Sequence, residues 1–439
     1  MPPTAPQLID DRPDEGVFRV HRDAFRDPDI FAAEVKHLFE GGWVFVGHAS
    51  QIPNPHDYIT TSVGQQPIVL MRAGDGSVGG FLNTCRHKGA MVCHQGRGNR
   101  KLHVCHYHAW SYSSAGKNIA IKDESAGAYT EAFKADCHDL QTVAAFEEYR
   151  GFLFASLTRP AHALADYLGD ARIFIDLIVD QSPDGIEIVP GTVSYTYKAN
   201  WKLQLENSTD AYHFTSTHPS YLRLLERRAK AADRQDVTAA IWQDKTGSAV
   251  EEQMGSFGFE HGHALVWTDS PIERHPLYDE LASLSKRVGQ TRSRWMLKTR
   301  QFNIFPNLQL ASNAALQMRV VRPLAADLTE IKSYCIAPKG EPPEKRRQRL
   351  RQYEDFFNPS GLATPDDTVT FEDCQRGFEC GAVQWQQGYM RGMTQVMAGP
   401  DDYARELGIH PAQSVNGPFS MSDETIFHTM YRAWARRLS

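Results

Sequence analysis

The chain contains 439 residues, of which 41% are hydrophobic, and its formal net charge is −6. This length predicts two or three domains, on a prior of roughly 100–200 residues for each, and the nearly balanced charge argues against a nucleic-acid partner. No run approaches the roughly 18 apolar residues of a membrane span, and seven cysteines, an odd number, argue against a disulfide framework. We therefore expect a cytoplasmic protein without a membrane or nucleic-acid partner.

A helix is predicted to begin near Asp27 and to end at Gly41, because apolar residues recur between them at helical spacing. Short β-like runs separated by turn signals follow. We therefore expect an N-terminal helical segment over residues 1–42 and an antiparallel β domain over residues 43–157. The helical segment should pack with a third part of the chain, residues 158–439.

The β domain carries two matched pairs of potential metal ligands. Cys85 and His87 form a C-x-H pattern, and after seventeen intervening residues Cys105 and His108 form a C-x2-H pattern. Zinc sites usually pair cysteine with cysteine at close range, whereas each pair here offers one thiolate and one imidazole. Two cysteines on one iron and two histidines on the other are the ligands of a Rieske [2Fe–2S] cluster. A mixed-ligand zinc site, or surface residues without a metal, is the alternative.

Further cysteine and histidine residues lie close to these pairs without repeating their spacing. Cys93, His94, His103 and His106 are therefore expected to be packing or surface residues. Positive groups and hydrogen bonds near the sulfur atoms tune such a cluster, so His106 and Lys88 could still influence its potential.

The next informative stretch, Trp201–His213, lacks Pro and Gly and is predicted to form one helix. Four polar residues recur along it at three- and four-residue steps, which places them on one face: Glu206, Asn207, Asp210 and His213. His218 follows just before Pro219, where a helix would bend or stop. A face so rich in acids, amide and imidazole is a costly way to build a core and suits the wall of a polar site.

His213 and His218 are candidate ligands of one iron. Two histidines and one carboxylate leave coordination positions open for O2 in non-haem iron oxygenases. The stretch Thr364–Gln375 supplies carboxylates, although acids after Pro365 also suit an ordinary helix start. Chemistry alone leaves four candidates for the third ligand: Asp366, Asp367, Glu372 and Asp373. β-like runs from Gln301 onward are expected to form the sheet against which the histidine-bearing helix packs.

The two patterns together resemble the large (α) subunit of Rieske non-haem iron ring-hydroxylating oxygenases, over nearly the whole chain. The similarity is greatest to the benzoate and anthranilate branch. Seven short segments carry it: Gly169–Arg172, Asp180–Pro183, Asn200–Leu203, Glu206–Asn207, Asp210–His213, Gly361–Asp367 and Cys374–Gly377. The resemblance implies an α+β fold in which a Rieske antiparallel β domain accompanies a helix-grip-like catalytic domain, an antiparallel sheet covered by helices. Residues 158–439 would form this catalytic domain.

The resemblance also implies roles for single residues. The cluster ligands would be Cys85, His87, Cys105 and His108, and the mononuclear iron ligands would be His213, His218 and Asp367. Asp210 matches a carboxylate that, in the family's trimers, links a Rieske histidine of one subunit to an iron-ligating histidine of the next. His108 would be the outer end of that link, and we expect Asp210 and Asn207 to act in catalysis. The loops depart from the family's usual residues at Arg86, Lys88 and His106. These positions flank ligands, so they affect the reduction potential of the cluster and the docking of the electron donor.

By this resemblance the protein is expected to be a terminal oxygenase that uses O2 and electrons from an NAD(P)H-dependent reductase. A ferredoxin or flavin reductase would be the direct donor, and the assembly would be an α3 homotrimer or an α3β3 complex with a small β subunit. The expected substrate is an aromatic carboxylate such as benzoate, anthranilate, salicylate or another ortho-substituted benzoate.

Arg319, on a β-like run, is the candidate for binding the substrate carboxylate, and a solvent-facing or ion-paired arginine is the alternative. Two other functions remain open for the chain. A Rieske monooxygenase that hydroxylates a ring or removes an O-methyl group would have the same metal ligands. A pure Rieske electron carrier would leave residues 158–439 without a role.

Overall fold

The structure is a computed structural model that describes residues 4–230, 253–269, 275–312, 315–417 and 422–439. It divides into two compact units. Residues 35–164 form one unit, and residues 1–34 together with 165–439 form the other, so the chain leaves the larger unit and later returns to it. Among the described residues, no helix is both long enough and apolar enough to cross a membrane.

The unit of residues 35–164 is built from small antiparallel sheets, with strand orders β6-β5-β4-β7, β10-β9-β8 and β11-β12-β3. Gly64 has a φ of +55° in the two-residue turn between β4 and β5, a conformation that glycine adopts without steric cost. The elements are β3 Val44–His48, β4 Asp57–Val63, β5 Gln66–Arg72, β6 Val78–Leu82, β7 Arg97–Asn99, β8 Leu102–Val104, β9 Ser111–Ser113, β10 Asn118–Ala120, α3 Glu131–Ala135, β11 Ala145–Tyr149 and β12 Phe152–Ser156.

One hydrophobic cluster of this unit packs around two cysteines, Cys85 and Cys105. Both are buried, together with Tyr58, Trp110 and Tyr112. Cys85 follows β6 and Cys105 follows β8, so different sheets deliver the two loops to one place. The sheets therefore bring together the two loops that carry the separate Cys–His pairs of the sequence.

Within the described residues, the larger unit is organised around a nine-stranded antiparallel sheet of order β13-β19-β18-β17-β16-β15-β14-β22-β21. Strands β14 to β19 follow one another in space as they do in sequence. A smaller sheet has the order β1-β2-β20. The strands are β1 Ile9–Arg12, β2 Val17–His21, β13 Ile186–Tyr197, β14 Met254–Gly258, β15 Ala264–Thr268, β16 Thr299–Ile304, β17 Leu308–Ser312, β18 Leu316–Ala325, β19 Leu328–Pro338, β20 Trp385–Gln386, β21 Met397–Ala398 and β22 Gln413–Asn416.

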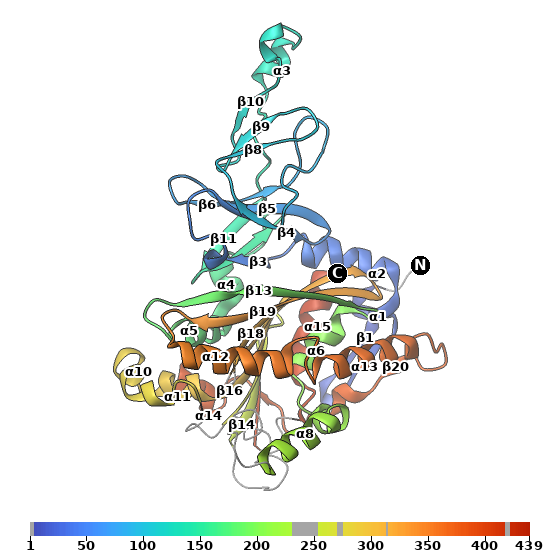
Figure 1. Cartoon of the computed structure of the whole chain (residues 1–439). Helices are drawn as coiled ribbons and strands as arrows, with labels where there is room; N and C mark the ends of the chain where they lie inside the picture. The colour runs from blue at the N-terminus through green and yellow to red at the C-terminus, as the bar shows by residue number, and fades with distance from the viewer. Residues whose placement is uncertain (1–3, 231–252, 270–274, 313–314, 418–421) are drawn as a thin grey trace. The chain divides into compact units, whose positions relative to one another are not determined.

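Helices cover the large sheet, and Figure 1 shows α12 and α13 running across its strands. α6 lies against β16 and β18, and α13 lies against both α6 and α7. The helices are α1 Asp23–Arg26, α2 Pro28–Glu34, α4 Leu164–Leu168, α5 Ile173–Val179, α6 Trp201–Ser208, α7 Phe214–Thr217, α8 Pro219–Lys230, α10 Leu281–Val288, α11 Gln290–Leu297, α12 Pro343–Gln352, α13 Thr364–Gly377, α14 Asp402–Leu407 and α15 Ile426–Arg437.

A buried ion pair fixes α6 in place. Glu34, at the end of α2, forms a salt bridge with Lys202, and both side chains are 1% exposed. The other contacts of this carboxylate come from two tryptophans, because the indole N–H groups of Trp201 and Trp434 donate to it at 2.8 and 2.7 Å. Breaking a buried pair by removing one partner costs about 3–5 kcal/mol. The helices α2, α6 and α15 are therefore held firmly to one another by the Glu34 carboxylate.

The predicted single helix over Trp201–His213 is wrong, because α6 ends at Ser208. The side chain of Asp210 accepts hydrogen bonds from the backbone N–H groups of Tyr212 and His213, at 2.5 and 3.4 Å. Aspartate often competes with helical hydrogen bonding in this way, and the chain turns where it does so. α7 then begins directly after His213.

Candidate metal centres and substrate cavity

The two cysteine-bearing loops have the same backbone hydrogen bonds. The carbonyl of Cys85 accepts from Gly89 N–H at 3.0 Å, and the carbonyl of Cys105 accepts from Ala109 N–H at 2.9 Å. Each cysteine N–H in turn donates to the carbonyl five residues later. Gly89 and Ala109 both have positive φ angles, +76° and +58°. The chain therefore builds the same loop twice, although only one of the two left-handed positions holds glycine.

The side chains of these loops present two thiols and two imidazoles. Cys85 and Cys105 are both 2% exposed, and burial together with the nearby Cys85 thiol raises the pKa of Cys105. The rings of His87 and His108 lie with their centroids 4.3 Å apart. Among the described residues, the Nδ1 atoms of both rings are buried without a hydrogen-bond partner. Paired thiols and paired, unpartnered imidazole nitrogens fit the donor set of a Rieske cluster.

A single zinc ion fits this donor set less well. Zinc sites usually pair cysteine with cysteine at close range, whereas each loop here offers one thiol and one imidazole.

Neighbouring groups surround the sulfur atoms without adding to the donor set. Tyr112 Oη lies 3.3 Å from Cys85 Sγ and accepts a hydrogen bond from the backbone N–H of Arg86 at 3.1 Å. Cys93 and His103 contact each other instead, with Sγ and Nδ1 3.2 Å apart in the core. Burial raises the pKa of Cys93 to about 11 and lowers that of His103 to about 4. These two residues therefore pack as a neutral pair.

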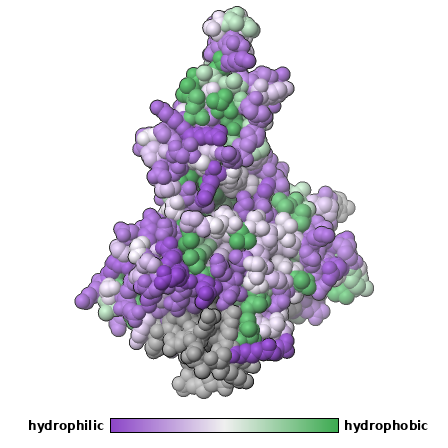
Figure 2. All heavy atoms as spheres, in the orientation of Figure 1, coloured by the Kyte–Doolittle hydropathy of each residue, from purple (hydrophilic) through white to green (hydrophobic). Residues whose placement is uncertain are grey.

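Several large hydrophobic side chains are exposed near these loops. Figure 2 shows hydrophobic side chains over the part of the unit that holds β8 to β10. The exposed large hydrophobic residues there include Met91, Leu102, Val104, Tyr107 and Ile119. His94 and His106 form an exposed contact of 2.9 Å on the same loops.

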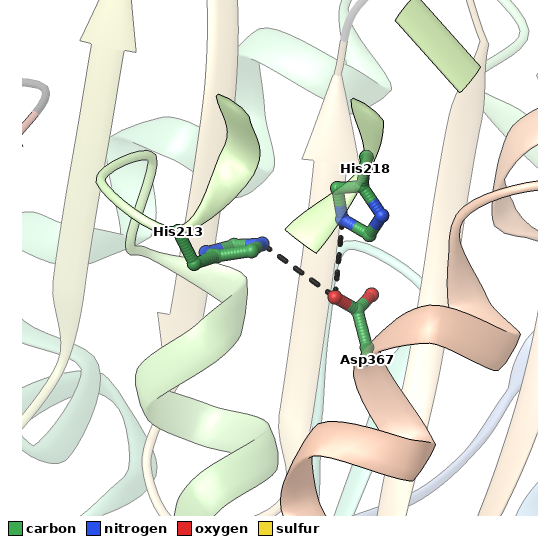
Figure 3. Close-up of side chains that lie close together, drawn as sticks. All are labelled: His213, His218 and Asp367. Carbon is green, nitrogen blue, oxygen red and sulfur yellow. Dashed lines mark ion pairs between the residues drawn. The ribbon is translucent and has the colours of Figure 1, made fainter. Parts of the chain in front are cut away.

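A second group of potential ligands lies in the larger unit, where α7 and α13 converge (Figure 3). His218 Nε2 is 3.1 Å from Asp367 Oδ1, and His213 Nε2 is 3.6 Å from the same oxygen. Asn207, from the last turn of α6, donates its amide N–H to Asp367 Oδ1 at 3.1 Å. Two imidazoles and one carboxylate, converging on one point, fit the ligand set of a mononuclear iron site with open positions.

The far nitrogen of each histidine contacts a further carboxylate. Asp210 Oδ2 lies 2.9 Å from His213 Nδ1, and Asp366 Oδ2 lies 3.3 Å from His218 Nδ1. Burial alone would lower the pKa of His213, but the Asp210 carboxylate outweighs burial and raises it. Such a carboxylate keeps the proton on Nδ1 and leaves Nε2 free for a metal.

The structure separates the four acids of α13. Asp367 faces the two histidines directly. Glu372 accepts a hydrogen bond from Lys198 N–H at 2.9 Å, and Asp373 forms a surface ion pair with Arg376. Asp366, which the sequence offers either as a possible third ligand or as an ordinary acid at a helix start, contacts the far ring nitrogen of His218.

Glu206 was predicted to share one helix face with Asn207, Asp210 and His213, but it does not lie with them beside the potential iron ligands. Its carboxylate accepts hydrogen bonds from the hydroxyls of Tyr389, at 3.0 Å, and Tyr431. Burial raises the pKa of Glu206 to about 7. Adjacent residues of a helix point in different directions, so Asn207, one residue later on α6, contacts Asp367 and His213 whereas Glu206 contacts the two tyrosines.

A cavity opens beside the three potential iron ligands, and His213, His218 and Asp367 are among its lining residues. Part of its wall is apolar, with Phe214, Leu310 and Phe357 among the lining residues. Arg319 of β18 also lines it and is 7% exposed. Its Nη2 donates to Thr364 Oγ1 at 2.7 Å and to the carbonyl of Phe357 at 3.3 Å. A cavity with an apolar part of its wall and an arginine beside potential metal ligands suits a small organic anion.

Comparisons with known proteins agree with this geometry. The family model described as ring hydroxylating alpha subunit (catalytic domain) matches residues 189–439, and the Rieske [2Fe-2S] domain model matches residues 42–143. The chain belongs to the ring-hydroxylating oxygenase α subunits. The expected α+β fold, a Rieske β domain with a catalytic domain of antiparallel sheet and helices, is therefore confirmed. As a member of this family the α subunit is an oxidoreductase with a Rieske [2Fe–2S] cluster and a mononuclear iron.

Similar proteins include dioxygenase subunits from several bacteria. The α subunit is 41% identical to toluate 1,2-dioxygenase subunit alpha of Pseudomonas putida, over 98% of this chain and 93% of that protein. It is 39% identical to the 2-halobenzoate 1,2-dioxygenase large subunit of Burkholderia cepacia and 37% identical to the anthranilate 1,2-dioxygenase large subunit of Acinetobacter baylyi, each over 98% of this chain and 91% of the relative. A solved structure of naphthalene 1,2-dioxygenase with indole bound superposes with a TM-score of 0.81 at 27% identity, over 96% and 92% of the two chains.

Proposed function

We propose that this α subunit is the terminal oxygenase component that dihydroxylates an aromatic carboxylate. Arg319 carries the proposal. It is a buried guanidinium in the cavity beside the iron ligands, and among the described residues it forms no ion pair. Burying an unpaired charge is costly. A substrate carboxylate that accepted two hydrogen bonds from the guanidinium would offset that cost.

The names of the similar proteins support the same class of substrate. Toluate, 2-halobenzoate and anthranilate are all benzoates, and each names a relative that this chain matches over nearly its whole length. In contrast to Arg319, the neighbouring Arg322 on β18 forms an ion pair with Glu330, 3.3 Å away. Two arginines on one strand thus differ in the feature that matters for binding an anion.

We assign the cluster to Cys85, His87, Cys105 and His108, and the mononuclear iron to His213, His218 and Asp367. When bound, these groups supply single-electron transfer and oxygen activation, respectively. The protein's own residues position and protect this chemistry. Asn207 holds the Asp367 carboxylate, Asp210 keeps a proton on His213 Nδ1, and Arg319 would orient the substrate ring.

We further propose that the α subunit works as an α3 trimer, alone or as α3β3 with a small β subunit. In that assembly Asp210 would link His213 to His108 of a neighbouring copy. Asp210 has a side chain 15% exposed, and His108 is half-buried, so both are near enough to a surface for such a link. Electrons would come from NAD(P)H through a ferredoxin or flavin reductase that reduces the cluster.

Substrate identity is tested with benzoate and toluene as a matched acid and neutral arene. The reconstituted oxygenase should convert benzoate, and Arg319→Met should raise its KM about 10–100-fold, because hydrogen bonds to a charged group contribute roughly 1.5–3 kcal/mol. The same variant should leave any conversion of toluene unchanged within about threefold. Arg322→Met is the control from the same strand and should affect neither substrate. Equal losses on acid and neutral arene in Arg319→Met would contradict the assignment.

The product distinguishes a dioxygenase from the monooxygenase alternative. With ¹⁸O-labelled O2, dihydroxylation places two labelled oxygen atoms in each product molecule, whereas ring monohydroxylation or O-demethylation places one at most. Mass spectrometry of the benzoate product measures this directly. Metal analysis completes the test, since about three irons per chain are expected for the oxygenase and about two for a simple Rieske electron carrier.

A further inference from the structure

One buried acceptor in the cavity wall remains without a donor. Gln309, on β17, is 4% exposed and lines the cavity. Its amide Nε2 donates to the backbone carbonyl of Gln204 at 2.7 Å. A carbonyl can only accept, so this contact fixes which way the amide faces. The Oε1 atom of Gln309 is then buried and, among the described residues, has no partner.

This acceptor differs from the other polar atoms of the cavity. Among the lining residues that the structure describes, the other buried side-chain atoms without partners are donors, Arg319 Nε and Trp267 Nε1. Gln317, the next glutamine along the sheet, already uses its amide N–H groups on Ser333 Oγ and the carbonyl of Phe357. A buried acceptor left unpaired costs roughly 1–3 kcal/mol. The cavity is therefore built for a ligand that brings a donor to Gln309.

The sheet register relates this acceptor to the cation. Gln309 and Arg319 are directly opposite each other on the antiparallel strands β17 and β18. Side chains so paired leave the same face of a sheet with Cβ atoms about 4.5–5.5 Å apart. A ligand that satisfies both must carry its anion and its donor close together, on neighbouring atoms of a small ring.

We propose that Gln309 is a specificity-determining residue that accepts a hydrogen bond from an amino group ortho to the substrate carboxylate. This inference rests on the proposed function, since Arg319 must hold the carboxylate for Gln309 to face the ortho position. The enzyme would then select a 2-aminobenzoate, because the amino group beside the carboxylate can donate to Gln309 Oε1.

The hydrogen count favours an amino over a hydroxyl group. An ortho hydroxyl has one hydrogen, and it is used in a hydrogen bond to the adjacent carboxylate of the same ligand. An ortho amino group has two, so one can bond to the carboxylate and the other to Gln309 Oε1. A methyl group or a halogen of similar size has none and would leave the acceptor unpaired.

The test compares 2-aminobenzoate with 2-methylbenzoate, which has nearly the same shape. For the wild-type holoenzyme with its reductase, kcat/KM should be at least about tenfold higher for the amino compound. The Kd of the anaerobic oxygenase, measured by calorimetry, should show the same preference without turnover. In Gln309→Leu both preferences should fall to about one, while kcat/KM for benzoate changes by less than about threefold.

Gln301→Leu is the matched control, because Gln301 lines the same cavity from β16 but is not paired with Arg319. It should keep the preference, and both variants should retain wild-type iron and cluster content. A wild-type enzyme that does not prefer the amino compound, or a preference that survives in Gln309→Leu, would overturn the inference while benzoate turnover still upheld the proposed function. Failure to bind any benzoate would overturn both.

Discussion

The two sets of proposed metal ligands are assembled in opposite ways. The Cys–His pairs span only residues 85–108 and are held by two loops with the same backbone hydrogen bonds. The other set joins His213 and His218 to Asp367, more than 140 residues further along the chain. The first depends on local turns, and the second depends on how α7 and α13 pack in the larger unit. Substitutions should therefore damage one centre while leaving the other intact.

The largest expected effect is that of Asp367→Ala. This variant should lose the mononuclear iron but keep the two cluster irons and the cluster absorbance, because no ligand of the loops is touched. Turnover should fall about a thousandfold or more, since a catalytic metal contributes several kcal/mol. Metal analysis and visible spectra measure the separation. Asp373→Ala, at an exposed position on the same helix, is the control and should retain three irons per chain.

The next effect is expected in Asp210→Ala, which removes the carboxylate that we propose links the two centres. Both metals should remain, and the donor should still reduce the cluster, but turnover should fall about a hundredfold or more because His213 loses the carboxylate that fixes its proton. Stopped-flow reoxidation of the reduced cluster with substrate and O2 reports this step. Wild-type reoxidation in the variant would remove Asp210 from the path.

A smaller effect is expected for Asp366→Asn. Asp366 contacts His218 Nδ1 at 3.3 Å without facing the ligand cluster. Loss of such a supporting carboxylate typically lowers metal affinity about 10–100-fold. Iron should therefore bind at full stoichiometry when supplied in excess and be removed by chelators more readily than from the wild type. Complete absence of iron would mean that Asp366 acts as a ligand.

The smallest effect concerns the cluster loops. Tyr112→Phe removes the hydroxyl 3.3 Å from Cys85 Sγ. A hydrogen bond to sulfur stabilises the more negative, reduced cluster, so its loss should lower the potential. About 1 kcal/mol for one hydrogen bond corresponds to about 40 mV for one electron. Redox titration measures the shift, and a raised potential would contradict a hydrogen bond from the Tyr112 hydroxyl to Cys85 Sγ.

The contrast also explains what the sequence could predict. The spacing of Cys85, His87, Cys105 and His108 is local, so the pattern alone indicates a Rieske cluster. Asp366 and Asp367 are adjacent on one helix, and only the packing of α13 decides which faces the histidines; the resemblance to a known family, not the chemistry, singled out Asp367. Side-chain competition at Asp210 ended a helix that propensity would have continued.

The cavity was the least predictable part. Arg319 could be proposed from its charge and its place on a strand, but its lack of an ion pair among the described residues is visible only in three dimensions. Gln309 carries no signal in the sequence, because a glutamine on a strand is ordinary. Its meaning depends on the register of β17 with β18 and on the contact with Gln204.

The buried pair of Glu34 and Lys202 joins parts of the chain that are far apart in sequence. Glu34 lies on α2, Lys202 lies on α6, and Trp434, which donates to the Glu34 carboxylate at 2.7 Å, lies on α15. Residues 35–164, which form a compact unit of their own, stand in the sequence between Glu34 and these partners. The carboxylate is therefore translated before the whole of the other unit, and its partners are translated after it.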